Sequence, residues 1–199
     1  MNVLGISEGF HDAGICLLRN DQIHFASHSE RHSRKKGDKW IHPNQLPKTH
    51  LIKPEIVAYY EKPFRKNLRR LYAGQRWQKP RNKYDVCFGH HESHAAAGYY
   101  TAPFDECNVL VIDAIGEWDT MSIWKGSVEN GYMGQKTHTL KKLSSWKYPH
   151  SLGLLYSAIT QRIGLKPNED EYITMGMAAF GEPKHDLENQ LWENNHRGV

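Results

Sequence analysis

The chain has 199 residues, enough for one domain with a real hydrophobic core, and 39% of them are hydrophobic, with 6 Trp and 10 Tyr. This composition is typical of a folded globular protein and excludes a disordered chain. No stretch approaches the roughly 20 apolar residues of a membrane span, and the N-terminus lacks a signal-peptide pattern. Cys16, Cys87 and Cys107 are far apart and have no metal-type spacing, so we expect reduced thiols in a cytoplasmic protein.

The net charge of +4 hides a strongly basic segment. Residues 30–83 hold 16 Lys or Arg against 4 Asp or Glu, about +12, which leaves about −8 for the rest of the chain. Aromatic residues lie among these charges, including Trp40 and Trp77. The pattern allows a solvated surface, a site for small phosphorylated ligands, or a nucleic-acid-binding face. The sequence alone does not decide among the three.

Short apolar runs at residues 3–7, 13–19 and 22–27, separated by turn residues, predict three strands at the start of the chain. Residues 34–83 lack strong periodicity and are punctuated by prolines. We therefore expect an insertion or an active-site flap over about 30–83, with a basic helix possible within 54–72.

The second half of the chain predicts alternating strands and helices. We expect a strand at 84–89, a helix at 92–101, a strand, tight loop and strand over 108–126, and a third strand within 131–143. Apolar residues then fall at helical spacing, with Ser151 as N-cap and Gly164 as C-cap; they are Leu152, Leu155, Ile159 and Ile163. This order predicts an α/β fold with a mixed sheet and flanking helices.

Three histidines and a glutamate stand together in "HHESH", residues 90–94. His90 and His94 are four residues apart, so a helix beginning near His90 places both imidazoles on one face, as a metal site requires. His91 and His94, three apart, are a poorer pair. Imidazoles suit iron, zinc, manganese or nickel but need a carboxylate or water to complete the shell. The alternative is that these histidines satisfy caps and backbone carbonyls.

Asp113 ends the apolar run of "VLVIDAIGEWDT". At the carboxyl end of a central strand its carboxylate would lie where ligands and metals gather in open α/β sheets. The following residues 114–116 predict a tight turn whose N–H groups could approach a phosphate. The alternative is an ordinary aspartate that caps a turn.

Two further stretches carry weaker signals. His11 and Asp12 occupy the first hairpin turn, where they could contact a ligand, although turns commonly contain aspartate. Residues 171–183, "EYITMGMAAFGEP", predict either a loop that lets a nucleotide approach the backbone or a helix capped by glycine. The chain has no G-x-S-x-G elbow, Walker loop or CxxC pair, which removes several common enzyme classes.

Six ordered stretches together resemble a known family. They are "GISEGFHDAGICLL", "SERHSRKKGD", "GHHESHAAAGYYTAPFDE", "VLVIDAIGEWDT", "YPHSLGLLYSAITQRIG" and "NEDEYITMGMAAFGEP". The sequence resembles the N-terminal part of the O-carbamoyltransferases of antibiotic and nodulation-factor biosynthesis, from about residue 3 to residue 185. The resemblance implies an actin/hexokinase-like, ribonuclease-H-like first lobe, and carbamoyl transfer to the hydroxyl of a small-molecule acceptor through carbamoyl-adenylate made from carbamoyl phosphate and ATP.

The resemblance also implies roles for particular residues. His90, His94 and Asp113 match metal ligands, with Fe(II) expected and manganese or zinc as alternatives. Asp12 would lie beside the acceptor hydroxyl, with Asp12 or His11 as the general base. The basic contact to the carbamoyl donor falls on Lys35 or Lys36, with Arg34 as a neighbour.

The resemblance further implies that residues 1–199 form an N-terminal lobe. The second lobe and the C-terminal adenylate-forming domain would come from a second polypeptide, and we expect no membrane partner. Two other functions remain open. One is a tRNA threonylcarbamoyl-transferase-like enzyme, which the basic segment favours, although we expect no nucleic-acid partner; the other is a non-catalytic metal- or nucleotide-binding module.

Overall fold

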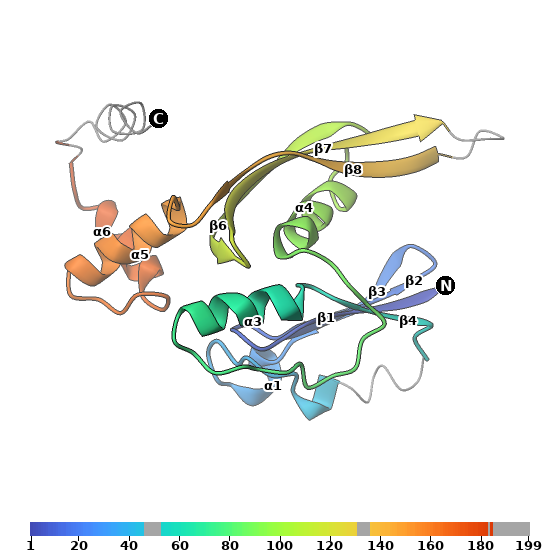
Figure 1. Ribbon diagram of the computed structural model, residues 1–199, viewed down its shortest axis with the longest axis horizontal. Coiled ribbons are helices and arrows are strands. Elements are labelled where there is room, and N and C mark those ends of the chain that lie inside the picture. The colour runs from blue at the N-terminus through green and yellow to red at the C-terminus, as the bar shows by residue number, and fades with distance from the viewer. Residues whose placement is uncertain (46–52, 131–135, 183, 185–199) are drawn as a thin grey trace. The chain divides into compact units, whose positions relative to one another are not determined.

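The structure is a computed structural model that describes residues 1–45, 53–130, 136–182 and 184 (Figure 1). The chain divides into two compact units, Met1–Leu152 and Gly153–Val199. Among the described residues, no helix has the length and apolar character needed to cross a membrane.

The first unit begins with a mixed five-stranded sheet. Its strands are β1 (Asn2–Ser7), β2 (Gly14–Arg19), β3 (Gln22–His28), β4 (Ile56–Tyr59) and β5 (Val86–Cys87). They lie in the order β3-β2-β1-β4-β5. The strand β2 is antiparallel to β1 and β3, whereas β4 is parallel to both β1 and β5. The three opening strands and the mixed α/β character were predicted from the sequence and are confirmed.

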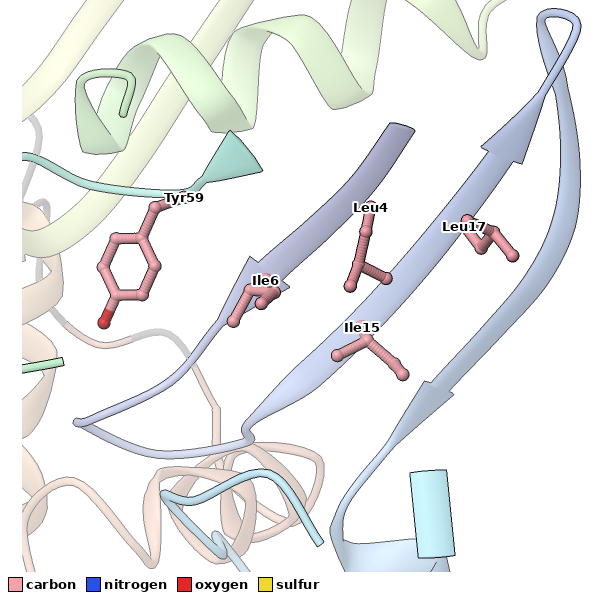
Figure 2. Packing of buried hydrophobic residues seen from close by; sticks show 5 residues of the cluster. All are labelled: Leu4, Ile6, Ile15, Leu17 and Tyr59. Atoms are coloured by element: carbon pink, nitrogen blue, oxygen red, sulfur yellow. The ribbon is translucent and has the colours of Figure 1, made fainter. Parts of the chain in front are cut away.

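The core of this sheet follows the period of two along its strands. In β1 and β2, Leu4 lies opposite Leu17 and Ile6 lies opposite Ile15, while Tyr59 of β4 lies opposite Ile6. All five side chains are buried in one cluster (Figure 2). This cluster fixes the parallel strands β1 and β4 side by side, so the loops that follow them begin at one edge of the sheet.

Part of the segment 30–83 differs from the expected insertion or flap. It holds α1 (Glu30–Ser33), the 3-10 turn η1 (Pro43–Gln45), β4, and α3 (Pro63–Tyr72), and β4 lies between β1 and β5 within the sheet. Residues 56–59 are therefore part of the first sheet. The strand has only four residues among prolines and charges, too few for a clear period. The helix expected within 54–72 is α3, with a proline in its first turn.

The later strands form a second sheet instead of joining the first. The strands β6 (Cys107–Gly116), β7 (Asp119–Asn130) and β8 (Lys136–Lys147) are antiparallel neighbours in that order. The mixed sheet was predicted, but this separate sheet was not, because consecutive strands joined by tight turns pair with each other and periodicity does not say which sheet they join. Of the third strand expected within 131–143, residues 131–135 lie outside the described residues.

The helix α4 (His90–Tyr100) packs on the second sheet. Its Ala95 shares a buried cluster with Val111 of β6 and Trp124 of β7. Tyr99, which is 1% exposed, donates its hydroxyl to the carbonyl of Asp105 at 2.9 Å. The helix expected at 92–101 is thus present, and it begins two residues earlier, at His90.

The second unit contains α5 (Leu152–Arg162) apart from its first residue, and α6 (Glu171–Ala178). Within it, Ser157 donates to the Glu171 carboxylate at 2.6 Å, and the hydroxyls of Thr160 and Thr174 are 2.9 Å apart. Gly164 follows α5 with φ +88, the left-handed conformation expected of a C-cap glycine. Of the two structures predicted for this stretch, a helix forms over Glu171–Ala178, but its C-cap is Ala179 and not a glycine; residue 183 lies outside the described residues.

Candidate metal centre

The start of α4 brings two imidazoles onto one face. The strand β5 ends at Cys87, and the N–H of Gly89 donates to the Glu92 carboxylate at 3.0 Å, which satisfies one donor at the helix start. His90 and His94 are then one turn apart, and their Nε2 atoms lie 3.1 Å from each other. The four-residue spacing in the sequence predicted this pairing.

The third member of the cluster comes from the second sheet. The Oδ2 of Asp113 lies 2.9 Å from the Nε2 of His90. Asp113 is not at the end of a central strand as expected, because β6 is an edge strand that continues to Gly116. Its pairing with β7 is regular to Ile112 and resumes only at Gly116, so Asp113 stands where the ladder is interrupted. Residues 114–116 are strand, and the turn falls after them.

Two of the three donor separations in this cluster suit one bound metal ion, and the pair of His94 and Asp113, within 4.8 Å, would draw closer around it. One ligand atom from each of His90, His94 and Asp113 lies within 4.8 Å of the other two. Two donors bound at about 2.1 Å to one ion are about 3.0 to 3.4 Å apart for angles between 90° and tetrahedral. The separations of 2.9 and 3.1 Å around Nε2 of His90 are close to that range. Two imidazoles and a carboxylate suit iron, zinc or manganese.

The electrostatics of the cluster centre on the proton of His90. Burial opposes its protonation, but the carboxylates of Asp113 and Glu61 outweigh burial and raise the pKa of His90 to about 9. Burial also acts on Asp113, yet His90 lowers the pKa of its carboxyl to about 2. Burial, with the neighbouring His90, lowers the pKa of His94. Without an ion, the cluster is therefore a charged His90–Asp113 pair beside a neutral His94.

Glu61 is a site residue that sequence reasoning missed. Its side chain is only 4% exposed, and its Oε2 lies 3.8 Å from Nδ1 of His90. Its other oxygen contacts the Lys66 ammonium of α3. One signal was available in the sequence: Glu61 is the first acidic residue after the run "IVAYY", and polar residues after a parallel strand gather at the sheet edge where ligands bind.

The other predicted site residues occupy two adjoining loops. His11 and Asp12 lie in the β1–β2 loop, both exposed, with Nδ1 of His11 2.7 Å from Oδ2 of Asp12. Arg34, Lys35 and Lys36 are exposed in the loop after α1. Backbone hydrogen bonds of 2.7 Å, from Gly9 to Lys39 and from Ala13 to Asp38, join the two loops. The structure thus places the loop of the general-base candidates beside the loop of the basic candidates.

These loops and the metal cluster share one edge of the first sheet. The strands β1, β4 and β5 are parallel, so the chain leaves all three toward the same edge. The loop of His11 follows β1, Glu61 follows β4 and His90 follows β5. Within the described residues, however, neither His11 nor Asp12 makes a hydrogen bond or ion pair with His90, His94 or Asp113. A ligand at this edge would have to bridge the two groups.

A comparison with known protein families identifies the family of this chain. The family described as Carbamoyltransferase N-terminus matches residues 48–198. The chain belongs to this carbamoyltransferase family. The match includes β4, Glu61, His90, His94 and Asp113, whereas His11, Asp12 and the loop at 34–36 lie outside it. The resemblance found in the sequence motifs is confirmed at the level of the family.

Individual relatives of this carbamoyltransferase-family chain are much longer. The uncharacterized protein sll1178 of Synechocystis is 32% identical over 92% of this chain and 35% of its own length. The uncharacterized protein MJ1051 of Methanocaldococcus jannaschii is 29% identical over 89% of this chain and 33% of its own. The nodulation protein NolNO of Sinorhizobium fredii is 27% identical over 92% and 30%. The chain spans about a third of the length of these relatives.

Proposed function

We propose that this chain carries the metal site and part of the substrate site of an enzyme that transfers a carbamoyl group to the hydroxyl of a small molecule. The observation that carries the proposal is the convergence of His90, His94 and Asp113, within 4.8 Å, in a member of the carbamoyltransferase family. We further propose that the five-stranded mixed sheet is the sheet of an actin-like first lobe.

In this proposal His90, His94 and Asp113 hold a divalent cation, Fe(II) first, with manganese or zinc as alternatives. When bound, the ion would supply a Lewis acid for the carbamoyl carbonyl or the adenylate phosphate. His94 is the most exposed of the three residues, although part of its ring is shielded from solvent, so a substrate can approach the cluster from its side. On its buried side the cluster faces the carboxylate of Glu61, 3.8 Å from Nδ1 of His90.

The neighbouring loops would bind the donor and remove the proton of the acceptor. Oδ2 of Asp12 is hydrogen-bonded to Nδ1 of His11 at 2.7 Å, and such a carboxylate–imidazole pair can take the proton of a hydroxyl. Both side chains are exposed, so an acceptor can reach them. Arg34, Lys35 and Lys36, in the adjoining loop, would neutralise the phosphate of carbamoyl-adenylate.

A basic residue of α3 favours an anionic ligand near the metal cluster. Arg69 has a buried Nε without a hydrogen-bond partner among the described residues. Burial lowers the pKa of this guanidinium, while the charges of Glu61 and Asp113 act to raise it. This guanidinium would add a positive charge for the phosphate of carbamoyl-adenylate.

The chain spans about a third of the length of its relatives, and we propose that the other steps of the reaction belong to the part that it does not span. We propose that a second polypeptide, corresponding to the other two thirds of the relatives, supplies the second lobe and the domain that makes carbamoyl-adenylate from carbamoyl phosphate and ATP. About two thirds of the length of the relatives lies outside the part that this chain matches, which supports a role for further domains in the reaction. Residues 1–199 would then be the N-terminal lobe of the transferase.

An activity assay tests the proposed function. The chain is combined with a polypeptide carrying the remaining part of the Synechocystis relative, under anaerobic conditions with Fe(II), ATP and radiolabelled carbamoyl phosphate. A panel of small hydroxylated acceptors is offered. We expect label in an acceptor only when both polypeptides are present, and its loss with His94→Ala. Transfer that is unchanged by His94→Ala would contradict the role of the metal cluster.

A further inference from the structure

The two ring nitrogens of His90 have different surroundings. Nε2 faces Asp113 at 2.9 Å and His94 at 3.1 Å. Nδ1 is buried, and it has no hydrogen-bond partner among the described residues. A buried ring nitrogen without a partner costs free energy, so a nearby group is expected to satisfy it. The carboxylate of Glu61 lies 3.8 Å away on that side.

Glu61 is held firmly behind His90. It follows the core strand β4 closely, and Lys66, one turn into α3, contacts its Oε1. The Lys66 ammonium also donates to the hydroxyl of Tyr60 at 3.3 Å, and the ring of Tyr60 meets the ring of His90 edge-on at 5.5 Å between centroids. The side chains of Glu61 and Lys66 are 4% and 7% exposed. The pair is therefore buried, and it places Oε2 of Glu61 beside the imidazole of His90.

We propose that Glu61 is a positioning residue that accepts a hydrogen bond from Nδ1–H of His90 and so directs the Nε2 lone pair at the metal ion. A histidine binds a metal through the nitrogen that carries no proton, and a carboxylate at the other nitrogen fixes that tautomer. A shift of about 1 Å converts the 3.8 Å contact into an ordinary hydrogen bond. The inference rests on the proposed metal site.

Glu61 does not act as a fourth ligand to the same ion. It faces Nδ1, whereas Asp113 and His94 face Nε2, so the imidazole ring stands between Glu61 and the cluster. Lys66 adds to this separation, because its ammonium occupies the other carboxylate oxygen. The role assigned to Glu61 is therefore orientation of His90, and metal affinity is the quantity that reports it.

The test uses a variant that removes the acceptor without leaving a buried charge. Glu61→Leu with Lys66→Met replaces the ion pair by apolar side chains, an exchange that is often neutral or stabilising. Anaerobic Fe(II) calorimetry on the whole chain should show one site whose affinity is lower by about 10- to 100-fold. Glu61→Gln, which keeps the side-chain size, should lose affinity by more than about threefold, because an amide oxygen is the weaker acceptor.

The matched control is Glu8→Gln. Glu8 is also a buried carboxylate at the end of β1, but it accepts from the backbone of Arg81 and Asn82 and not from His90. The metal affinity of this variant should stay within about twofold of the parent chain, since Glu8 lies outside the His90 contacts. The control separates loss of a buried carboxylate from loss of the contact with His90.

A second readout detects the tautomer directly. In the zinc-loaded parent chain, nitrogen NMR should find the His90 proton on Nδ1 and in slow exchange, and Glu61→Leu with Lys66→Met should lose that slow exchange. Affinity and exchange both equal to those of the parent, in a folded variant, would overturn the positioning role and leave the metal site standing. A parent chain that binds neither Fe(II) nor zinc would overturn both the metal site and this inference.

Discussion

At the scale of single residues, a proton and a metal ion compete for His90. Asp113 and Glu61 raise the pKa of His90 to about 9 against the effect of burial, so the ring is protonated at neutral pH in the metal-free chain. A metal ion binds only the neutral imidazole and must displace this proton. This competition sets the pH dependence of metal affinity.

We therefore predict that metal affinity rises with pH. Below the folded pKa of about 9, affinity should increase about tenfold per pH unit, and it should level off above that pH. His94, whose pKa is lowered by burial, should add no second proton near neutral pH. Zinc titrations against a competing chelator at three pH values, about 6.5, 7.5 and 8.5, measure the slope. A constant affinity over this range would contradict the assigned state of His90.

Gly116 gives the rings of His90 and His91 the space that they occupy. A Cβ on Gly116 would lie 2.4 Å from Cδ2 of His90 and 2.8 Å from Cδ2 of His91. Real Cβ atoms do not approach other atoms so closely, so Gly116→Ala must move the rings. We predict that Gly116→Ala destabilises the fold by about 1–3 kcal/mol and lowers the metal affinity.

A second glycine supplies the control for that variant. A Cβ on Gly126 would lie 2.3 Å from the ring of Tyr99, which is away from the cluster. Gly126→Ala should destabilise the fold by a similar amount and leave the metal affinity of the folded protein unchanged. Denaturant unfolding and calorimetry on both variants measure the two quantities. Equal losses of metal affinity in the two variants would contradict the role of Gly116 in leaving space for the His90 ring.

At the scale of elements, α4 connects the two sheets, because its side chains make hydrogen bonds toward both of them. Ser93 donates to the carbonyl of Tyr60, just after β4, at 2.7 Å. His91 is hydrogen-bonded through Nδ1 to the hydroxyl of Ser122 on β7 at 2.7 Å, and that hydroxyl also accepts from the Trp124 indole at 2.8 Å. The helix that carries both imidazoles is thereby fixed to the strand neighbouring that of Asp113.

We predict that Ser122→Ala weakens this connection. Ser122 is fully buried, and its removal leaves the Trp124 N–H and Nδ1 of His91 without a partner, at a cost of about 1–3 kcal/mol in the free energy of unfolding. Ser127→Ala is the matched control, because the Ser127 hydroxyl is only partly buried and shares its bond with Thr139. It should cost less than about 1 kcal/mol. Chemical denaturation of both variants measures the difference.

The sequence predicted those elements whose residues carry a local signal. The alternating and apolar runs of the first three strands, and the i, i+4 spacing of His90 and His94, depend on neighbours in the chain. The strand β4 did not stand out, because four residues give no period and its place is set by pairing with β1 and β5. Asp113 was named as a candidate from the sequence. Its place on an edge strand, where the pairing with β7 is interrupted, depends on how the second sheet forms. Glu61 acquires its role only through contacts with Lys66 and His90.

At the scale of the whole molecule, the candidate centre unites separate parts of the chain. The two imidazoles come from the helix after the first sheet, and the carboxylate comes from an edge strand of the second. Metal binding at this centre therefore reports that both sheets of the first unit have folded around α4. It also tests for the metal site on which the proposed carbamoyl transfer depends.

Anaerobic Fe(II) calorimetry of the whole chain tests this account most directly, with His94→Ala beside it and His24→Ala as the control. His24 is an exposed imidazole on β3 outside the cluster. We predict saturable binding near one equivalent for the parent chain and for His24→Ala, and no such binding for His94→Ala. No specific binding by the parent chain, or equal binding by all three proteins, would contradict the assignment of a metal to His90, His94 and Asp113.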